Sequence, residues 1–198
     1  MFKKHTEPSW DALFRFAISL TKNEPEAEDL VQQTLLKALA SFPAFLKTNY
    51  QLESDEIALE FAQNSDTELL NRHTMNWIMK IAKNAFLDNR NRASQRLTHL
   101  PLAEWDEEQS SKTIDTPSIT SSDLSESIQE LEQQFYQQAL DDEWTEKFAT
   151  LNPKQRSVLF LTAEDYSYKE IAQLLDIPIG TVMSTLNRAI KKLRNIQK

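Results

Sequence analysis

Apolar side chains recur every three to four residues near both ends of the chain, and this spacing predicts α-helices. In the N-terminal half, the pattern begins at Leu13 and continues to Leu20, which predicts a first helix there. No segment shows a convincing strand pattern, and the chain contains a single glycine. The expected fold class is therefore all-α.

A second helix is predicted to begin at Asn23, because an asparagine followed three residues later by Glu26 is typical of a helix N-terminus. One face of this helix is mainly apolar and carries Ala27, Leu30, Val31, Thr34, Leu35 and Ala38. At about 100° per residue, the opposite face carries Asp29, Gln32, Gln33 and Leu36. A leucine exposed among polar side chains is either an ordinary surface residue or a contact for a partner.

A third helix is predicted over residues 74–96. Its core side is expected to carry Trp77, Ile78, Ile81, Ala82 and Ala85, and its other side Lys80, Lys83, Leu87 and Arg90. Six basic residues and one acid lie between Arg72 and Arg96. Such a face is either simply solvated or binds nucleic acid, since cations neutralise phosphates. We interpret Trp77 as a core residue and not as a platform for stacking bases.

The C-terminal segment contains two helix caps followed by a tight turn. Asn152 with Gln155 and Ser167 with Glu170 have the spacing of N-terminal caps. Residues 176–178 end the second of these helices, and Gly180 leads into a last one. Two short helices separated by a tight turn and followed by basic residues indicate a helix-turn-helix.

The last helix is predicted to have an apolar face and a basic face. Val182, Leu186, Ala189, Ile190 and Leu193 should face the core, and from Thr181 onward the chain has five basic residues and no acid. Such a helix is either an ordinary surface helix or a reader of the major groove, where polar side chains contact base edges and lysines hold phosphates. The candidate contacts are Thr181, Ser184, Asn187, Arg188, Lys191 and Lys192.

The charge of the chain is concentrated in its middle. The net charge is -8, and residues 99–146 alone carry 13 acids and one base. This segment is also rich in serine and threonine and has too little apolar surface to order itself. We therefore expect two small helical domains, over residues 1–98 and 147–198, joined by an acidic flexible linker over 99–146.

Several classes of protein are excluded by composition. One glycine cannot build a phosphate-binding glycine loop, and the absence of cysteine removes disulfides, thiolate nucleophiles and cysteine-bound metals. The three histidines have no metal-ligand spacing, and no nucleophile and base pair stands out. We expect no enzyme, no cofactor, no metal, no integral membrane segment and a cytoplasmic location.

The motifs resemble a known family. LNPKQRSVLFLTAEDYSYKEIAQLLDIPIGTVMSTLNRAIKKLR, over residues 151–194, resembles the C-terminal promoter-reading domain of extracytoplasmic-function (group 4) sigma factors of the bacterial sigma-70 family. AEDLVQQTLLKAL at 27–39 resembles a helix that docks on the polymerase. WIMKIAKNAFLDNRNR at 77–92 resembles the helix that opens and reads the upstream edge of the transcription bubble. The resemblance omits roughly residues 45–73 and most of the linker.

This resemblance implies a non-enzymatic RNA polymerase subunit that directs transcription initiation. Its implied partners are bacterial core RNA polymerase, promoter DNA and an anti-sigma factor. The implied polymerase contacts are Asp29, Gln32, Gln33 and Leu36. The implied minus-10 contacts are Lys80, Lys83, Asn84, Asn89 and Arg90. The minus-35 contacts are the six candidates on the last helix.

The chain departs from the family pattern in three places. The recognition helix usually reads like TVKSRLHRAR, so Met183 and Thr185 stand where cations are customary. Restoring Lys and Arg at these two positions is expected to tighten DNA binding. Asp176 replaces a common turn glycine, and aspartate tolerates the left-handed conformation. Apolar residues in the segment 45–73, namely Ile57, Leu59, Phe61, Leu69 and Leu70, predict an extra helix that packs on the first domain.

Two alternatives remain open at this point. The chain is also compatible with an operator-binding repressor or activator that uses the same helix-turn-helix. It is further compatible with a sigma-like interaction module that sequesters a regulator without starting transcription. Autonomous DNA binding distinguishes the first alternative, and run-off transcription distinguishes the second.

Overall fold

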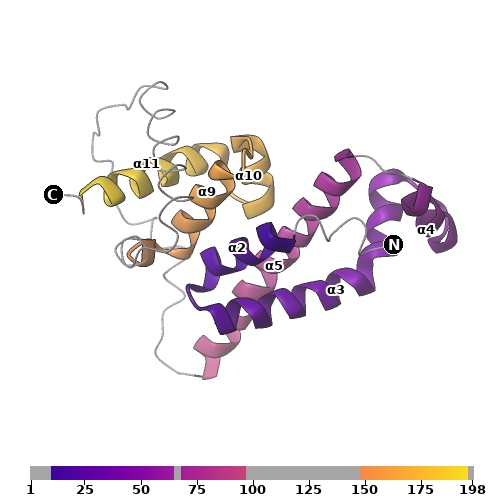
Figure 1. The fold of residues 1–198 in the computed structure, drawn as a ribbon, viewed down its shortest axis with the longest axis horizontal. Helices are drawn as coiled ribbons and strands as arrows, with labels where there is room; N and C mark the ends of the chain where they lie inside the picture. The colour runs from indigo at the N-terminus through magenta and orange to yellow at the C-terminus, as the bar shows by residue number, and fades with distance from the viewer. Residues whose placement is uncertain (1–9, 65–67, 97–147, 196–198) are drawn as a thin grey trace. The chain divides into compact units, whose positions relative to one another are not determined.

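The computed structural model describes residues 10–64, 68–96 and 148–195, and every regular element within these ranges is a helix (Figure 1). The predicted all-α class is therefore confirmed for this part of the chain. The helices are α2 (Trp10–Thr21), α3 (Glu24–Tyr50), α4 (Asp55–Asn64), α5 (Glu68–Arg96), α9 (Pro153–Ala163), α10 (Tyr168–Leu175) and α11 (Ile179–Asn195). The acidic linker predicted over 99–146 lies outside the described residues.

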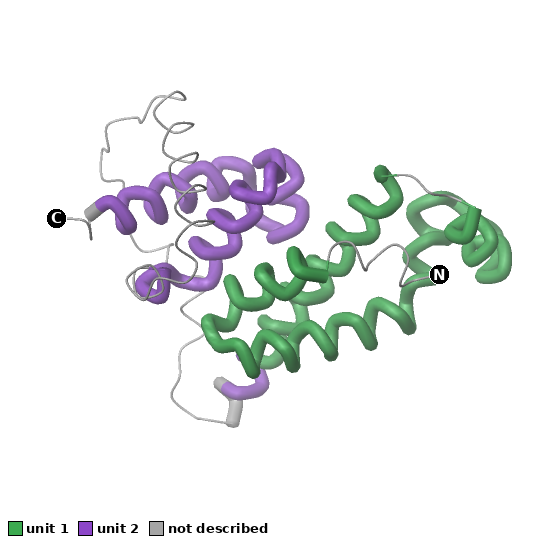
Figure 2. The backbone as a smooth tube through the Cα atoms, in the orientation of Figure 1, with its two compact units in different colours: residues 1–89 green, residues 90–198 purple. Residues whose placement is uncertain are grey.

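The chain divides into two compact units, residues 1–89 and residues 90–198 (Figure 2). The division falls inside α5, whose last residues are grouped with the second unit. None of the helices in the described ranges combines the length and apolar character needed to cross a bilayer.

The first unit is built on α3, which begins as the sequence predicts. The Asn23 side chain accepts a hydrogen bond from the backbone N–H of Glu26 at 3.2 Å. Helix α3 packs against α2, and Leu13, Phe16 and Leu30 are buried among the core side chains of the two helices. The helix continues well past the predicted apolar face, through an internal proline, to Tyr50.

Helices α3 and α5 run antiparallel and contact each other at several points, two of which lie far apart along the helices. The Phe45 and Trp77 rings stack with centroids 4.3 Å apart and planes 17° apart. The side-chain amide of Asn89 donates to the Gln33 carbonyl oxygen at 3.0 Å. The two contacts are twelve residues apart on each helix, which corresponds to about 18 Å of helix. Trp77 thus has the packing role that its sequence position predicts.

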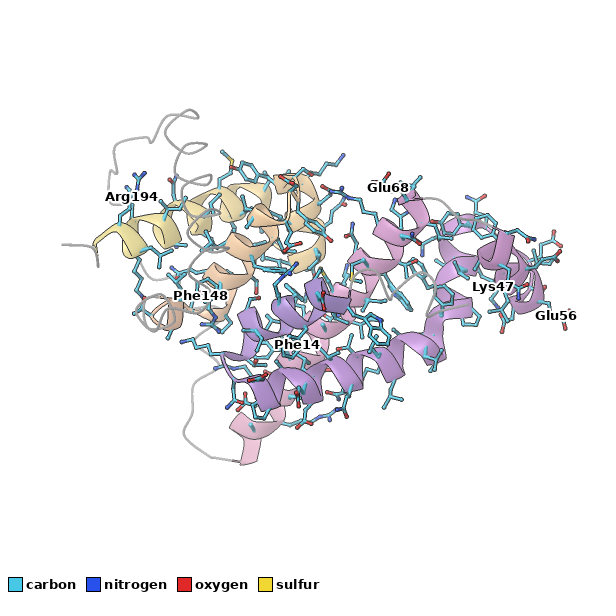
Figure 3. All side chains as sticks on the ribbon, in the orientation of Figure 1. Phe14, Lys47, Glu56, Glu68, Phe148 and Arg194 are labelled. Atoms are coloured by element: carbon cyan, nitrogen blue, oxygen red, sulfur yellow. The ribbon has the colours of Figure 1, made fainter. Side chains whose placement is uncertain are left out.

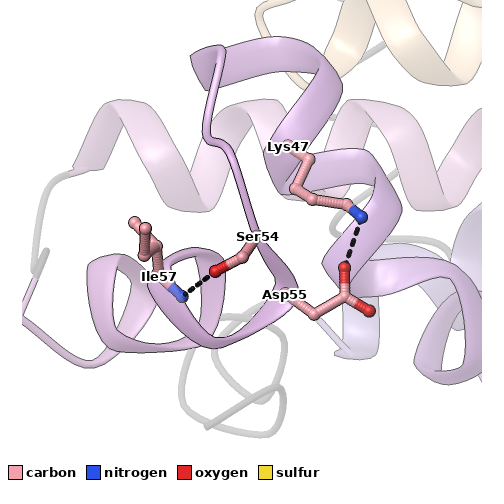
Figure 4. A network of polar contacts seen from close by, with 4 residues as sticks. All are labelled: Lys47, Ser54, Asp55 and Ile57. Carbon is pink, nitrogen blue, oxygen red and sulfur yellow. Dashed lines mark hydrogen bonds and ion pairs between the residues drawn. The ribbon is translucent and has the colours of Figure 1, made fainter.

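The predicted extra helix exists as α4, but different residues pack it. Ser54 caps the helix by accepting the Ile57 N–H at 3.2 Å, and Lys47 of α3 pairs with Asp55 at 2.5 Å (Figure 4). The buried positions on α4 are Ala58 and Ala62. The larger residues behave differently from the expectation: Ile57, Leu59 and Leu69 are exposed, Phe61 is half-buried and Leu70 is buried. Small side chains let α4 approach α3 closely, and this turns two of its larger apolar side chains outward.

Aromatic side chains surround the contact between α4 and its neighbours. The rings of Tyr50 and Phe61 lie 4.9 Å apart, and Tyr50 also makes a 3.2 Å hydrogen bond with His73 Nδ1. Burial raises the pKa of Tyr50 above the ordinary phenol value, so the phenol is neutral near pH 7. The histidine therefore takes part in a contact between the end of α3 and the start of α5.

Within residues 148–195 of the second unit, α9 and α10 begin at the predicted caps. Both caps are capping boxes, formed by Asn152 with Gln155 and by Ser167 with Glu170. In each box the side chain of the cap residue accepts a hydrogen bond from the backbone N–H of its partner, and the partner's side chain accepts one from the backbone N–H of the cap residue. Asp176 ends α10 in the left-handed conformation, with φ of 60°, as expected for the residue that replaces a turn glycine. Helix α11 packs against both α9 and α10.

Candidate partner-binding and DNA-binding surfaces

The outer face of α3 carries an exposed aliphatic pair among polar side chains. Leu36 is 71% exposed and Leu39 is 56% exposed, although each belongs to a helix that buries most of its other leucines. Asp29 and Gln32 are exposed on the same side. We call Asp29, Gln32, Leu36 and Leu39 the α3 face. Leu39 is the member that the sequence analysis missed, although its spacing of three residues from Leu36 places it on the same side of the helix.

Gln33 lies at the edge of the α3 face and is half-buried. Its carbonyl oxygen accepts the hydrogen bond from Asn89. A residue expected to contact polymerase and a residue expected to contact the minus-10 element are therefore bonded to each other. Within the first unit, both side chains hold α3 against α5.

In the middle of α5, between residues 74 and 88, the exposed residues are confined to one side of the helix. Lys80 and Asn84 lie one turn apart on this side, where a helix spacing of four residues brings side chains to the same face. Both are exposed, as expected for two of the candidate minus-10 contacts. Arg90 is half-buried nearer the end of the helix.

Lys83 does not lie on the exposed side of α5, and this expectation was wrong. The side chain is 5% exposed. The buried arc of α5 is wider than the sequence pattern suggests, because Met75 and Met79 are buried together with Ile78 and Ala82. At about 100° per residue, Lys83 lies only about 40° beyond Met79, at the margin of that arc.

The start of α11 offers a surface with few free polar groups. Thr181 and Ser184 are half-buried, and the Ser184 hydroxyl donates to the Thr181 backbone carbonyl at 3.1 Å. Asn187 is half-buried one turn further on, and its side-chain oxygen has no hydrogen-bond partner among the described residues. This oxygen is buried, so it can meet a ligand only if the side chain turns outward.

The second half of α11 is basic. Arg188 is exposed, Lys191 is half-buried on the same side of the helix, and Arg194 lies near its C-terminal end (Figure 3). Lys192 was expected to contact phosphate. In this structure its ammonium instead donates a hydrogen bond to the Thr150 carbonyl oxygen at 2.6 Å. The lysine ties the end of α11 to the residues before α9.

The two positions that lack the customary cations differ from each other. Met183 is 46% exposed, whereas Thr185 is completely buried. Thr185 lies about 60° from Val182 at the centre of the buried face, when each residue is given about 100°. Of the two positions only 183 is exposed, so a cation at 185 would have to enter the core, while the effect of both changes on DNA binding stays a prediction.

Comparisons with known proteins support a helix-turn-helix in the C-terminal part of the chain. Residues 142–193 match the family model described as Sigma-70, region 4. The chain is 29% identical over 202 residues to the ECF RNA polymerase sigma factor SigE of Mycolicibacterium smegmatis, covering 95% of this chain and 61% of that protein. It is 29% identical over 183 residues to the ECF RNA polymerase sigma factor EcfG of Rhodopseudomonas palustris, covering 92% and 77%. The chain thus spans about three fifths of the length of SigE.

A solved structure has the same fold. It is the co-crystal structure of the sigma factor RpoE in complex with the anti-sigma factor NepR from Bartonella quintana, which matches with a TM-score of 0.54 and 21% identity. The match covers 99% of this chain and 96% of that one. The comparisons therefore show that residues 142–193 match sigma-70 region 4 and that most of the chain is similar to extracytoplasmic-function sigma factors.

Proposed function

We propose that this protein is a sigma factor that binds core RNA polymerase and directs it to promoters with a minus-35 and a minus-10 element. The observation that carries this proposal is the presence, in one chain, of the α10–α11 helix-turn-helix and the exposed α3 face. A helix-turn-helix reads duplex DNA, and exposed leucines among polar groups suit a partner surface. The protein would act in the cytoplasm as a non-enzymatic subunit.

Within this function each unit has its own task. The α3 face docks on the polymerase, with Leu36 and Leu39 as its apolar anchors. Lys80, Asn84 and Arg90 on α5 contact the melted minus-10 strand, and Asn89 acts with Gln33 to position this helix. Thr181, Ser184, Asn187, Arg188 and Lys191 on α11 contact the minus-35 duplex.

Reconstitution with core polymerase tests the proposal. The purified chain is titrated onto a promoter fragment alone and with core polymerase, and run-off transcription is measured. A sigma factor should give strong promoter binding and run-off product only when both are present. Equal promoter binding with and without polymerase would instead support an operator-binding regulator. Polymerase binding without any run-off product would support an interaction module, for which an anti-sigma factor is the natural partner to test.

A further inference from the structure

The first two turns of α11 present an apolar row to solvent. Ile179 is 47% exposed and Met183 is 46% exposed, and they are spaced four residues apart so that they share one side of the helix. Asn187 continues the same row one turn later. Two large apolar side chains left exposed at the start of a recognition helix are not required by the core, which is filled by Val182, Leu186 and Ile190.

Gly180 stands beside this row and has no internal reason to be glycine. It is the single glycine of the chain, its φ is not positive, and a Cβ added there would meet nothing within 4 Å. Glycine also lowers the propensity of a helix to form. The absence of a side chain at Gly180 allows a binding partner to approach the backbone of α11 closely.

Hydrogen-bonding groups are scarce on the same two turns. The Ser184 hydroxyl proton is used by the Thr181 carbonyl, and Thr185 is buried. The positive charge of α11 begins only at Arg188. The part of the helix whose N-terminal residues should contact base edges in a helix-turn-helix is therefore mainly apolar.

We propose that Ile179 and Met183 read the C5-methyl groups of thymines in the minus-35 element. The methyl group of thymine is the apolar feature that a base pair displays in the major groove, and apolar side chains recognise it. Gly180 allows the start of the helix to lie close to the base edges. This inference rests on the proposed function, because it assigns a base preference to the same helix.

Charge complementarity favours DNA as the occupant of this row over a protein. From Thr181 to the end of the chain there are five basic residues and no acid, and Arg188 and Lys191 follow the row along the helix. A surface that is apolar at one end and cationic at the other matches base methyls flanked by phosphates. The customary lysine at position 183 would add a phosphate or guanine contact, so methionine there exchanges a charge contact for methyl recognition.

Replacement of thymine by deoxyuridine tests the inference, because it removes the methyl group and keeps the base-pairing edge. Preferred minus-35 duplexes are first selected from a randomised library with the reconstituted holoenzyme. Each thymine of the selected element is then replaced singly by deoxyuridine. We expect about a fourfold loss of affinity at one or two thymines, which is the factor given by burying one methylene-sized group. Thymines outside the element serve as internal controls and should give no loss.

Variants of α11 connect the methyl effect to the side chains. In Met183→Ala or Ile179→Ala, deoxyuridine should no longer weaken binding at the thymine that the residue contacts. Met183→Leu keeps an apolar side chain and should keep the effect. Met183→Lys should lose it and increase the salt dependence by about one unit, as expected for an added phosphate contact.

The outcomes separate this inference from the proposed function. If the holoenzyme selects duplexes that have no thymine in the element, or if no deoxyuridine replacement weakens binding, thymine reading is wrong while the sigma function stands. Unchanged DNA affinity in both Met183→Ala and Ile179→Ala would also overturn thymine reading. It would indicate that the apolar row binds a protein partner instead. If the holoenzyme selects no duplex beyond those that core polymerase binds, the proposed function fails, and the inference fails with it.

Discussion

Leu36→Asp should separate polymerase binding from folding. Because Leu36 is 71% exposed, the substitution removes little packing from the first unit, and surface changes alter stability by about 0.5 kcal/mol or less. If the side chain becomes buried against polymerase, its loss costs at least about 2 kcal/mol of binding, or roughly thirtyfold in Kd. The new carboxylate also lies on the side of the helix that carries Asp29, which adds repulsion to any acidic partner surface.

Titration of labelled core polymerase with each variant measures the binding, and thermal unfolding measures the stability. Ser41→Asp provides a matched control, because it places the same carboxylate at an exposed position of α3 on another side of the helix. It should bind normally. Leu30→Ala, at a site that is 3% exposed, should instead lose about 2 to 5 kcal/mol of stability. Normal polymerase binding by Leu36→Asp, or unfolding of that variant, would refute the assignment of the α3 face.

The remaining predictions concern the second unit. Thr185→Arg should lower the stability of this unit by about 3 kcal/mol or more, because an unpaired charge enters a buried site. Met183→Lys should leave the melting temperature nearly unchanged, and equal melting temperatures of the two variants would contradict the burial of Thr185. Ser167→Ala should cost about 1 kcal/mol by removing a helix cap, as measured by denaturant unfolding, and no loss would show that the capping box is dispensable. Arg188→Ala should weaken the preferred minus-35 sequence by about 1 to 3 kcal/mol and relax preference at one base pair, whereas Lys191→Ala should weaken all sequences alike. A panel of single-base promoter variants at two salt concentrations checks this difference, and a uniform loss in Arg188→Ala would contradict base reading by that residue.

Local signals in the sequence were sufficient to predict several helix ends in the C-terminal segment. The cap at Asn152, the capping box at Ser167 and the left-handed turn at Asp176 each depend on residues within a few positions of one another. Such contacts form whatever the rest of the chain does. The same holds for the apolar face of α11, where the helical period alone places Val182 and Leu186 in the core.

Residues at the margin of a buried face could not be placed from the period alone. Lys83 and Thr185 are each close to the edge of an apolar arc, and neighbouring helices decide whether such an edge is covered. Leu39 shows an omission instead, since it is exposed but was assigned neither to the core nor to the candidate partner contacts. In α4 the small size of Ala58 and Ala62 determines the packing, while the larger Ile57 and Leu59 gave the stronger sequence signal. The partners of Gln33 and Lys192 lie 56 and 42 residues away along the chain, beyond any local pattern.

Genome-wide mapping of transcript starts tests the central claim most directly. Core polymerase from the host is reconstituted with the purified chain and transcribes genomic DNA, and the starts are compared with those of core polymerase alone. Our account predicts a new set of starts that share a pair of motifs at the minus-35 and minus-10 positions. The same starts with and without the chain would contradict the account, as would new starts that share no motif.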